Sequence, residues 1–279
     1  MSEPEIHIFN HHAMATQFQV RIARAEKTYA AQTAQAAFAL ADELEAQLSR
    51  FRANSEISQI ARLLPGEKLR LCEPVLACLT IARRMEFATR GAFSATAAAL
   101  KNQPAKPSWV LVPAEFSIRC DSGRLEFDLG AIGKGFALDR MAELLREWEC
   151  RSFLLVAGGS SILAGEAPAG TAGWDCGLGD DSSARRHWLA NVSLSGSGLA
   201  VKGAHIFDPR TGQSARRQNR VWALASTAAE SDALSTAAMV LDEIEITGVT
   251  GKNPDWLVLL NEDKEWRQLG GRAVPPTAG

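Results

Sequence analysis

Residues 128–139 read Asp128-Leu-Gly-Ala-Ile-Gly-Lys-Gly-Phe-Ala-Leu-Asp139, and this stretch tells most about the fold and the ligand. Its glycine-bracketed turn lies between a short alternating segment and an amphipathic segment, so we expect a strand, a turn and a helix. Glycines let a backbone approach a ligand closely, and the free N–H groups of a helix start attract anions. With Lys134 inside the turn, the stretch indicates a phosphate-bearing ligand.

Neither standard nucleotide loop is present, because the spacing matches neither Gly-x-x-x-x-Gly-Lys-[Ser/Thr] nor Gly-x-Gly-x-x-Gly. An ordinary strand-to-helix connection, with glycines for packing, is therefore the alternative interpretation of this stretch.

The composition is that of a globular protein, with 279 residues of which 46% are apolar and 22% charged. The chain is long enough for a large core, and we expect residues 1–279 to form one domain or two intimately packed subdomains. Its 30 basic and 32 acidic residues leave a formal charge of −2, with no basic run. We therefore expect no nucleic acid among its partners.

Cysteine usage and the N-terminus both bear on the compartment. The five cysteines are scattered and contain no Cys-x-x-Cys pair, which argues against a disulfide framework or a zinc site and suits the cytosol. Residues 1–7 are acidic and polar, unlike a signal peptide, and no later run is apolar enough to span a membrane. We expect a cytoplasmic protein without an integral membrane segment, although a chain trimmed of its leader would look the same.

Hydrophobic periodicity and turn residues predict an α+β fold of helices mixed with many hairpin-like strands. Helices are expected over 30–48, 73–90, 136–148 and 231–241, with a short one from Asn54 or Ser55 to Arg62. Strands are expected over 13–23, 116–120, 124–129, 153–157, 161–164, 174–178, 187–194, 221–226 and 256–260. The second and third of these flank Asp121-Ser-Gly as a hairpin, whereas 102–113, with three prolines, is expected to be a loop.

A carboxylate and a hydroxyl lie four residues apart in Asp232-Ala-Leu-Ser-Thr236, and therefore on one face of the expected helix. Mg²⁺ prefers such hard oxygen ligands and keeps its remaining positions for water or phosphate. The alternative is a helix start with an aspartate in its first turn, a placement that the helix dipole favours by itself.

A second group of polar residues lies in Gly203-Ala-His-Ile-Phe-Asp-Pro-Arg-Thr-Gly212, where Asp-Pro and Thr-Gly indicate a turn. His205 enters this turn from an expected strand and could exchange protons near neutral pH, or be a hydrogen-bonded structural residue. The other four histidines predict no site: three lie near an N-terminus expected to be mobile, and His187 lies in a loop or at a strand edge.

Taken together, the motifs resemble the ApbE family of FAD:protein FMN transferases, in family order and over most of the chain. The resemblance rests on seven pieces: Met14-Ala-Thr-Gln-Phe, Leu48-Ser-Arg-Phe followed by Ser55-Glu-Ile-Ser, Gly91-Ala-Phe, Asp128-Leu-Gly-Ala-Ile-Gly-Lys-Gly, Ala157-Gly-Gly-Ser, His205-Ile-Phe-Asp-Pro-Arg-Thr-Gly and Asp232-Ala-Leu-Ser-Thr. It implies an ApbE-like (T-fold-like) architecture of mixed or antiparallel sheets with flanking helices.

The resemblance also implies a reaction. Members of the family transfer FMN from FAD, with Mg²⁺, to a Thr or Ser hydroxyl of an acceptor flavoprotein and release AMP. Carried over by position, His205 would be the general base. The residues implied at the FAD site are Met14, Phe51, Ala92, Phe93, Ser94, Asp128, Lys134 and Ile206. Those implied at the metal are Asp232, Ser235, Thr236 and the backbone carbonyl of Ala131.

The chain departs from the family pattern in three ways. Ser94 stands where the family usually has Asp, Ala61 stands where it often has Asn, and the signal peptide and lipid-attachment Cys of many members are missing. Losing one hydrogen bond to a ligand costs on the order of 1 kcal/mol, which would weaken FAD binding without abolishing it. Two alternatives therefore stay open: an FAD diphosphatase that gives FMN and AMP, and a non-catalytic FAD-binding protein.

Overall fold

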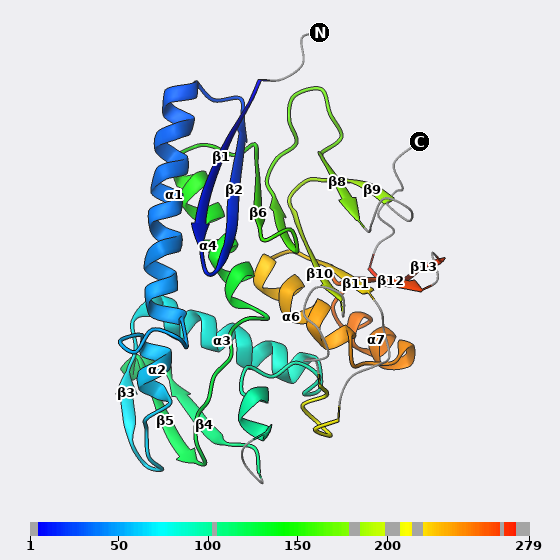
Figure 1. The fold of residues 1–279 in the computed structure, drawn as a ribbon. Helices are drawn as coiled ribbons and strands as arrows, with labels where there is room; N and C mark the ends of the chain where they lie inside the picture. Colours follow the sequence, from blue (N-terminus) through cyan, green and yellow to red (C-terminus); the bar gives the residue numbers. More distant parts are fainter. Residues whose placement is uncertain are drawn as a thin grey trace.

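The computed structural model describes residues 5–101, 105–178, 185–198, 207–213, 220–262 and 265–271. Within these ranges the α-helices are α1 (Lys27–Leu48), α2 (Glu56–Ile60), α3 (Glu73–Ala88), α4 (Gly133–Glu147), α6 (Ala228–Ala238) and α7 (Glu243–Thr250). Figure 1 shows them on and below a long sheet. The expected α+β class is confirmed.

The main sheet has the strand order β1-β2-β6-β7-β10-β11-β12-β13, and each neighbouring pair is antiparallel. Its strands are β1 (Ile6–Ala13), β2 (Thr16–Ala23), β6 (Phe153–Ala157), β7 (Ser161–Ala164), β10 (Val192–Gly198), β11 (Arg220–Ala225), β12 (Leu257–Glu262) and β13 (Glu265–Gly270). Sequence-adjacent hairpins build most of this order, and the strand expected over 256–260 is β12, which pairs with β13.

The two faces of the sheet follow the period-2 alternation of its strands. In β2, Phe18, Val20 and Ile22 point into the large core under α1, α4 and α6. In β6 and β12, Leu154 and Leu257 point to the other face, which the hairpin of β8 (Trp174–Leu178) and β9 (Arg185–Leu189) covers. The helices therefore lie on one side of the sheet, and the site is built on that side.

A second sheet of order β3-β5-β4 lies beyond α3 (Figure 1), and it corrects two expectations. Strand β4 (Ser108–Val112) forms where a loop was expected, because Pro107 and Pro113 fall just outside it and Trp109 is buried against Phe127. Strand β5 (Ser117–Ser122) pairs with β4 and β3 (Lys68–Arg70). The expected hairpin with 124–129 is therefore wrong.

Strand β1 is the other correction, since the N-terminal histidines were expected in a mobile segment. Its register runs from Ile6 opposite Ala23 to Ala13 opposite Thr16. His7 is 8% exposed and its Nε2 lies 3.1 Å from the Ala25 carbonyl, and the Nε2 of His11 lies 2.8 Å from Asp42. These polar partners satisfy two of the three histidines of this strand.

Element ends differ from the sequence pattern by a few residues. Helix α6 begins at Ala228, capped by Thr227, rather than at Ser231. The expected strand 187–194 is two strands, β9 and β10, separated by Asn191, whose φ is +52°. Within the described residues, no helix combines the length and the apolar character needed to cross a membrane.

Candidate functional site

Two tight turns meet at one end of the main sheet and frame a cavity of about 370 Å³. Met14 and Ala15, with φ of +50° and +56°, connect β1 to β2, and Gly158 and Gly159 connect β6 to β7. A Cβ atom on Gly158 would lie 2.4 Å from the Oγ1 of Thr16, so only glycine lets the turns pack this closely.

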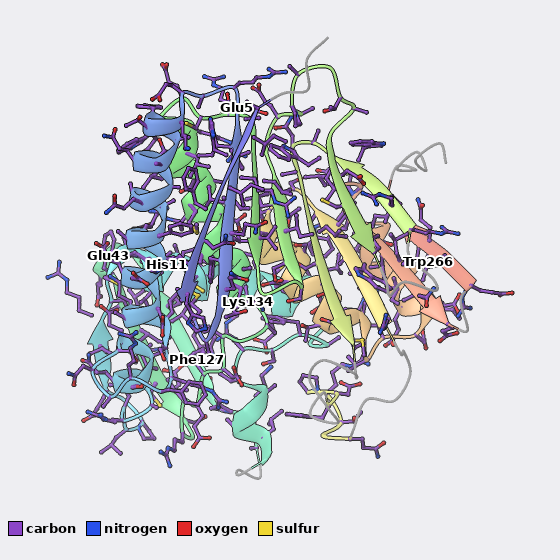
Figure 2. The ribbon with its side chains drawn as sticks, turned by 45° about the horizontal axis from the view of Figure 1, so that its top comes forward. Glu5, His11, Glu43, Phe127, Lys134 and Trp266 are labelled. Carbon is purple, nitrogen blue, oxygen red and sulfur yellow. The ribbon has the colours of Figure 1, made fainter. Side chains whose placement is uncertain are left out.

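The cavity brings together four residues that the resemblance implies at the FAD site: Met14, Phe51, Asp128 and Lys134. They come from the β1–β2 turn, the loop after α1, the segment before α4 and α4 itself. Figure 2 shows Lys134 beside the end of the β1–β2 hairpin. Residues far apart in the sequence therefore share one cavity, although the sequence could only group them by analogy.

The outer wall of this cavity is open and charged. Phe51 is 83% exposed, and the guanidinium of Arg50 lies 4.6 Å from the centre of its ring. Arg50 also forms a 3.5 Å ion pair with Asp128. An exposed aromatic face with charges nearby suits a flat, polar-edged ring such as a flavin or an adenine.

Lys134 lies in the first turn of α4, not in the preceding turn as the sequence suggested. The N-cap residue of α4 is Ile132, which makes no side-chain capping hydrogen bond. The amide of Gly133 donates to the carbonyl of Leu129 at 2.6 Å, and the amide of Gly135 donates to the Oδ2 of Asp232 at 2.8 Å.

Asp232 is held at the junction of α4 and α6. Its side chain is buried, and its Oδ1 accepts a 2.6 Å hydrogen bond from the hydroxyl of Ser161. A Cβ atom on Gly135 would lie 2.1 Å from the carbonyl oxygen of Ala228, so a glycine is needed for α4 to approach α6. Asp232 is thus held by the glycine-rich motif, and two separate sequence signals become one structural unit.

Asp139 completes this junction one turn further along α4. Its carboxylate accepts hydrogen bonds from the amides of Ala228 and Ala229, at 2.7 and 2.9 Å, and so caps the start of α6. Burial raises the pKa of Asp139 to about 7, against the lowering effect of the two amides, and nearby Asp232 raises it further. Sequence reasoning missed both Asp139 and Ser161, because each acts on a helix or carboxylate distant in the chain.

The helix α6 rests on β10 through hydroxyl groups. The Oγ of Ser231 lies 2.8 Å from the Oγ atoms of both Ser193 and Ser195, and Ser197 lies 3.0 Å from Ser235. Ser235 is buried and donates to the carbonyl of Asp232, while Thr236 is half-buried. Small side chains on both elements let the helix and the strand lie close together.

The chemical nature of the ligands implied at the metal determines which metal ion they could hold. The described residues contain no group of three or more His, Cys, Asp or Glu side chains that could together hold a metal ion. The ligands that the resemblance implies offer oxygen alone, with one carboxylate: Asp232, Ser235, Thr236 and the carbonyl of Ala131. Such a set fits Mg²⁺, which commonly takes one or two carboxylates and fills its other positions with water and phosphate, and does not fit zinc.

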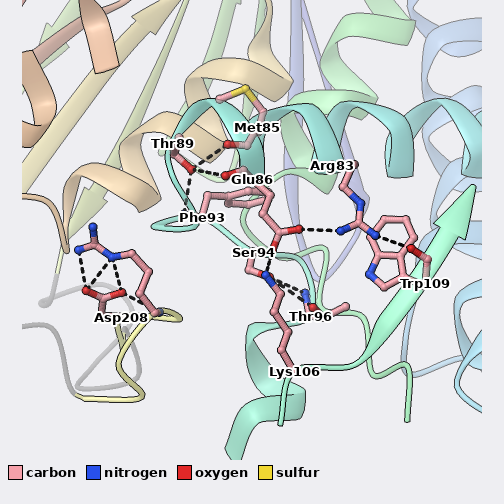
Figure 3. A network of polar contacts seen from close by, with 11 residues as sticks. Arg83, Met85, Glu86, Thr89, Phe93, Ser94, Thr96, Lys106, Trp109 and Asp208 are labelled. Carbon is pink, nitrogen blue, oxygen red and sulfur yellow. Dashed lines mark hydrogen bonds and ion pairs between the residues drawn. The ribbon is translucent and has the colours of Figure 1, made fainter. Parts of the chain in front are cut away.

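Ala92, Phe93 and Ser94 lie in the turn after α3 and are buried. They are not among the residues that line the cavity, although the amide of Asp128 donates to the carbonyl of Ala95, next to Ser94, at 2.7 Å. The Oγ of Ser94 lies 3.3 Å from the Oγ1 of Thr96 (Figure 3). The hydroxyl of Ser94 therefore has a hydrogen-bond partner in its near neighbour Thr96.

His205 and Ile206 lie outside the described residues, so their implied roles stay predictions. The turn that follows them is described: Asp208 accepts from the amide of Arg210 at 2.9 Å and pairs with its side chain, which also reaches Glu245. These two carboxylates raise the pKa of the Arg210 guanidinium, and the hydrogen bonds that Arg210 donates to Asp208 have the largest effect. The expected Asp-Pro/Thr-Gly turn is therefore fixed against α7.

Comparison with known proteins identifies the family to which this chain belongs. Residues 14–257 match the model described as the ApbE family. FAD:protein FMN transferases from Klebsiella pneumoniae and Treponema pallidum are 27% and 29% identical, over 41% and 47% of this chain and 36% and 42% of their own length. The chain thus matches less than half of each of these two relatives. A third, from Vibrio cholerae, is 23% identical over 85% of this chain and 82% of its length.

Two solved structures share the fold. Flavin transferase ApbE from Vibrio cholerae aligns with a TM-score of 0.80 at 21% identity, covering 96% of this chain and 97% of its own. The apo form of Pseudomonas stutzeri flavinyl transferase ApbE aligns with a TM-score of 0.81 at 20% identity, covering 98% and 99%. The expected ApbE-like architecture is confirmed.

Proposed function

Because this chain belongs to the ApbE family, we propose that it is an FAD:protein FMN transferase, which moves FMN from FAD to a Thr or Ser hydroxyl of an acceptor flavoprotein and releases AMP. The observation that carries the proposal is the junction of α4 and α6. There the buried carboxylate of Asp232 is held by Gly135 and Ser161, next to the cavity lined by Asp128 and Lys134.

Two ligands enter the proposal with this function. FAD is the substrate, and Phe51, Met14 and Asp128 line the cavity that we assign to it. Mg²⁺ would be held by Asp232, Thr236, Ser235 and the carbonyl of Ala131, and would supply Lewis-acid stabilisation of the pyrophosphate charge. Lys134, in the first turn of α4, brings a second positive charge to the same end of the cavity.

The reaction needs a base and a leaving group. The acceptor hydroxyl attacks the phosphorus on the FMN side of the pyrophosphate, a new P–O bond forms, and the bond to the bridging oxygen breaks so that AMP leaves. A Ser or Thr hydroxyl is a poor nucleophile until its proton is taken, and we assign that step to His205. Lys134 stabilises the negative charge that grows on the departing AMP phosphate.

The five cysteines are free thiols, which suits a reducing compartment, and we place the reaction in the cytoplasm.

The experiment is one incubation of the purified protein with FAD and Mg²⁺, with and without a peptide that carries a Thr acceptor. Chromatography follows FAD, FMN, AMP and flavinylated peptide, and a His205→Ala variant is the control. We expect flavinylated peptide and AMP in equal amounts, and neither product from the control.

Other outcomes would replace the proposal. AMP with free FMN, unaffected by the peptide, would identify an FAD diphosphatase, in which water takes the place of the hydroxyl. Intact FAD that stays bound without AMP would identify an FAD-binding protein, and would make Ser94 and Ala61 the first positions to restore.

A further inference from the structure

A second cavity, of about 800 Å³, lies at the C-terminal end of α3, outside the site described above. Its charged and aromatic lining residues are Arg83, Glu86, Phe87, Arg90, Lys106 and Lys252. We call it the basic pocket. None of the implied FAD-site or metal-site residues that the structure describes lines it, so it needs an explanation of its own.

The floor of the basic pocket is a built arrangement rather than a loose surface cluster (Figure 3). Glu86 is 8% exposed and pairs with Arg83, at 3.4 Å, and with Lys106. The guanidinium of Arg83 stacks 3.6 Å from the ring centre of Trp109 and donates to its carbonyl at 2.7 Å. Because Trp109 is itself buried, these contacts hold the cations in place.

The pocket carries surplus positive charge. Among the described residues, four cations and one carboxylate line the pocket, and that carboxylate, Glu86, already forms ion pairs with two of the cations. Arg90 and Lys252 are exposed. The guanidinium of Arg90 lies close to α7, because a Cβ atom on Gly248 would lie 3.3 Å from its Nη2. A concave surface with this excess attracts anionic groups.

The rim of the pocket is apolar and exposed. Phe87 is 88% exposed, beside the cations on the outer face of α3. An aromatic side chain in such a position gains contact area only when a second molecule covers it, and exposed aromatics next to arginine are typical of protein-recognition surfaces.

The pocket also adjoins the turn that follows the implied base. Gly91 lines the pocket and directly precedes Ala92. A Cβ atom on Gly91 would lie 3.5 Å from the Cγ of Arg210, in the turn that follows His205 in the chain. A polypeptide bound in the pocket would therefore lie against this turn.

We propose that the basic pocket docks an acidic segment of the acceptor protein, with Arg90 and Lys252 pairing with its carboxylates and Phe87 covering its apolar flank. The inference rests on the proposed function, since it names the partner of that reaction. It assigns the pocket to recognition of the acceptor and not to FAD.

The test compares two fluorescent peptides that share a Thr-containing core, one flanked by aspartates and its twin by asparagines. Binding is measured by anisotropy to the wild-type chain, to Arg90→Glu/Lys252→Glu, and to Arg24→Glu/Lys27→Glu. The last variant makes the same change in charge at exposed positions around the start of α1, at the upper end of Figure 1. We expect the acidic peptide to bind the wild-type and control chains about tenfold more tightly than its twin, and the pocket variant to lose this preference.

Equal binding of the twins, or an unchanged preference in the pocket variant, would overturn the docking proposal. So would inorganic phosphate that competes with the acidic peptide at equal affinity, because the pocket would then be a site for small anions. AMP release from FAD and Mg²⁺, with saturating acceptor, is measured in parallel. Its absence would contradict the proposed function, whereas normal release without a peptide preference would contradict docking alone.

Discussion

The junction of α4 and α6 and the cavity between the two turns are neighbours of opposite character. At the junction, Asp232 is buried and both of its oxygens accept fixed hydrogen bonds. In the cavity, Phe51 is 83% exposed and Asp128 forms an ion pair with a half-exposed arginine, Arg50.

This difference separates two tasks. Groups that stabilise charge in a transition state work best when they are held in place before the reaction, because no reorganisation is then needed. Groups that hold the flat parts of a large substrate can adapt to it. We therefore expect changes at the junction to affect catalysis or the fold, and changes in the cavity wall to affect affinity.

The largest effect of a single added methyl group is expected from Gly135→Ala, which places that group 2.1 Å from the carbonyl oxygen of Ala228. Relieving this clash moves α4 away from α6, at a cost of about 1–3 kcal/mol in the free energy of unfolding. Gly133→Ala is the matched control in the same helix, because its methyl group would meet only Leu129, at 3.6 Å. Urea unfolding compares the two, and equal stability would mean that the helices are not packed as described.

The next effect concerns pH and Asp139. Its pKa is raised to about 7 in the folded chain from an ordinary value of 3.8, so between these values the folded state keeps a proton that the unfolded state has lost. Stability therefore falls as pH rises through this window, by about 1.4 kcal/mol for each unit of pKa difference. Asp139→Asn removes this titration. The unfolding free energy of the variant, relative to that of the wild type, should therefore increase from pH 4 to pH 7. Parallel pH profiles would contradict this.

A smaller effect is expected at Ser161, whose hydroxyl orients Asp232. Ser161→Ala removes one hydrogen bond to a charged group, worth about 1.5–3 kcal/mol, so the rate constant for AMP release should fall by about tenfold or more. Higher Mg²⁺ should restore part of the loss if metal affinity is what suffers. Ser193→Ala also removes a buried hydroxyl, but one that does not touch Asp232, and should leave the rate nearly unchanged.

The smallest effect is expected from the open wall. Phe51→Ala removes an exposed ring that gains contact only with the substrate, so KM for FAD should rise by about threefold to tenfold while kcat stays close to the wild-type value. A steady-state titration of FAD separates the two constants. A fall in kcat at unchanged KM would place Phe51 in the chemistry and erase the contrast between the two regions.

How far the sequence predicted this molecule depends on whether a signal was local. Helices α1, α3 and α4 followed from spacing, and the short helix α2 is capped by Ser55, one of the two residues expected at its start. Strand β4 could not be predicted, because the prolines around it indicated a loop. They lie just outside the strand, whose stability comes from the packing of Trp109 on Phe127.

The candidate site shows the same limit. Met14, Phe51, Asp128 and Lys134 were grouped by resemblance alone, and only the fold brings them to one cavity. Asp139 was the last residue of the opening motif, yet its role depends on amides almost ninety residues away in the sequence. Side chains that act on a distant helix leave no periodic signal, so only the structure could identify them.

The most direct test of the account is the pair of constants for Asp232→Asn: the dissociation constant for FAD, from flavin fluorescence, and the rate constant for AMP release at saturating FAD and Mg²⁺. Asparagine keeps the shape and can still accept from Ser161 or Gly135 while losing the charge. We predict that FAD binding changes by less than about tenfold while AMP release falls by about a thousandfold. Full AMP release by this variant would contradict the claim that the α4–α6 junction is the chemical centre.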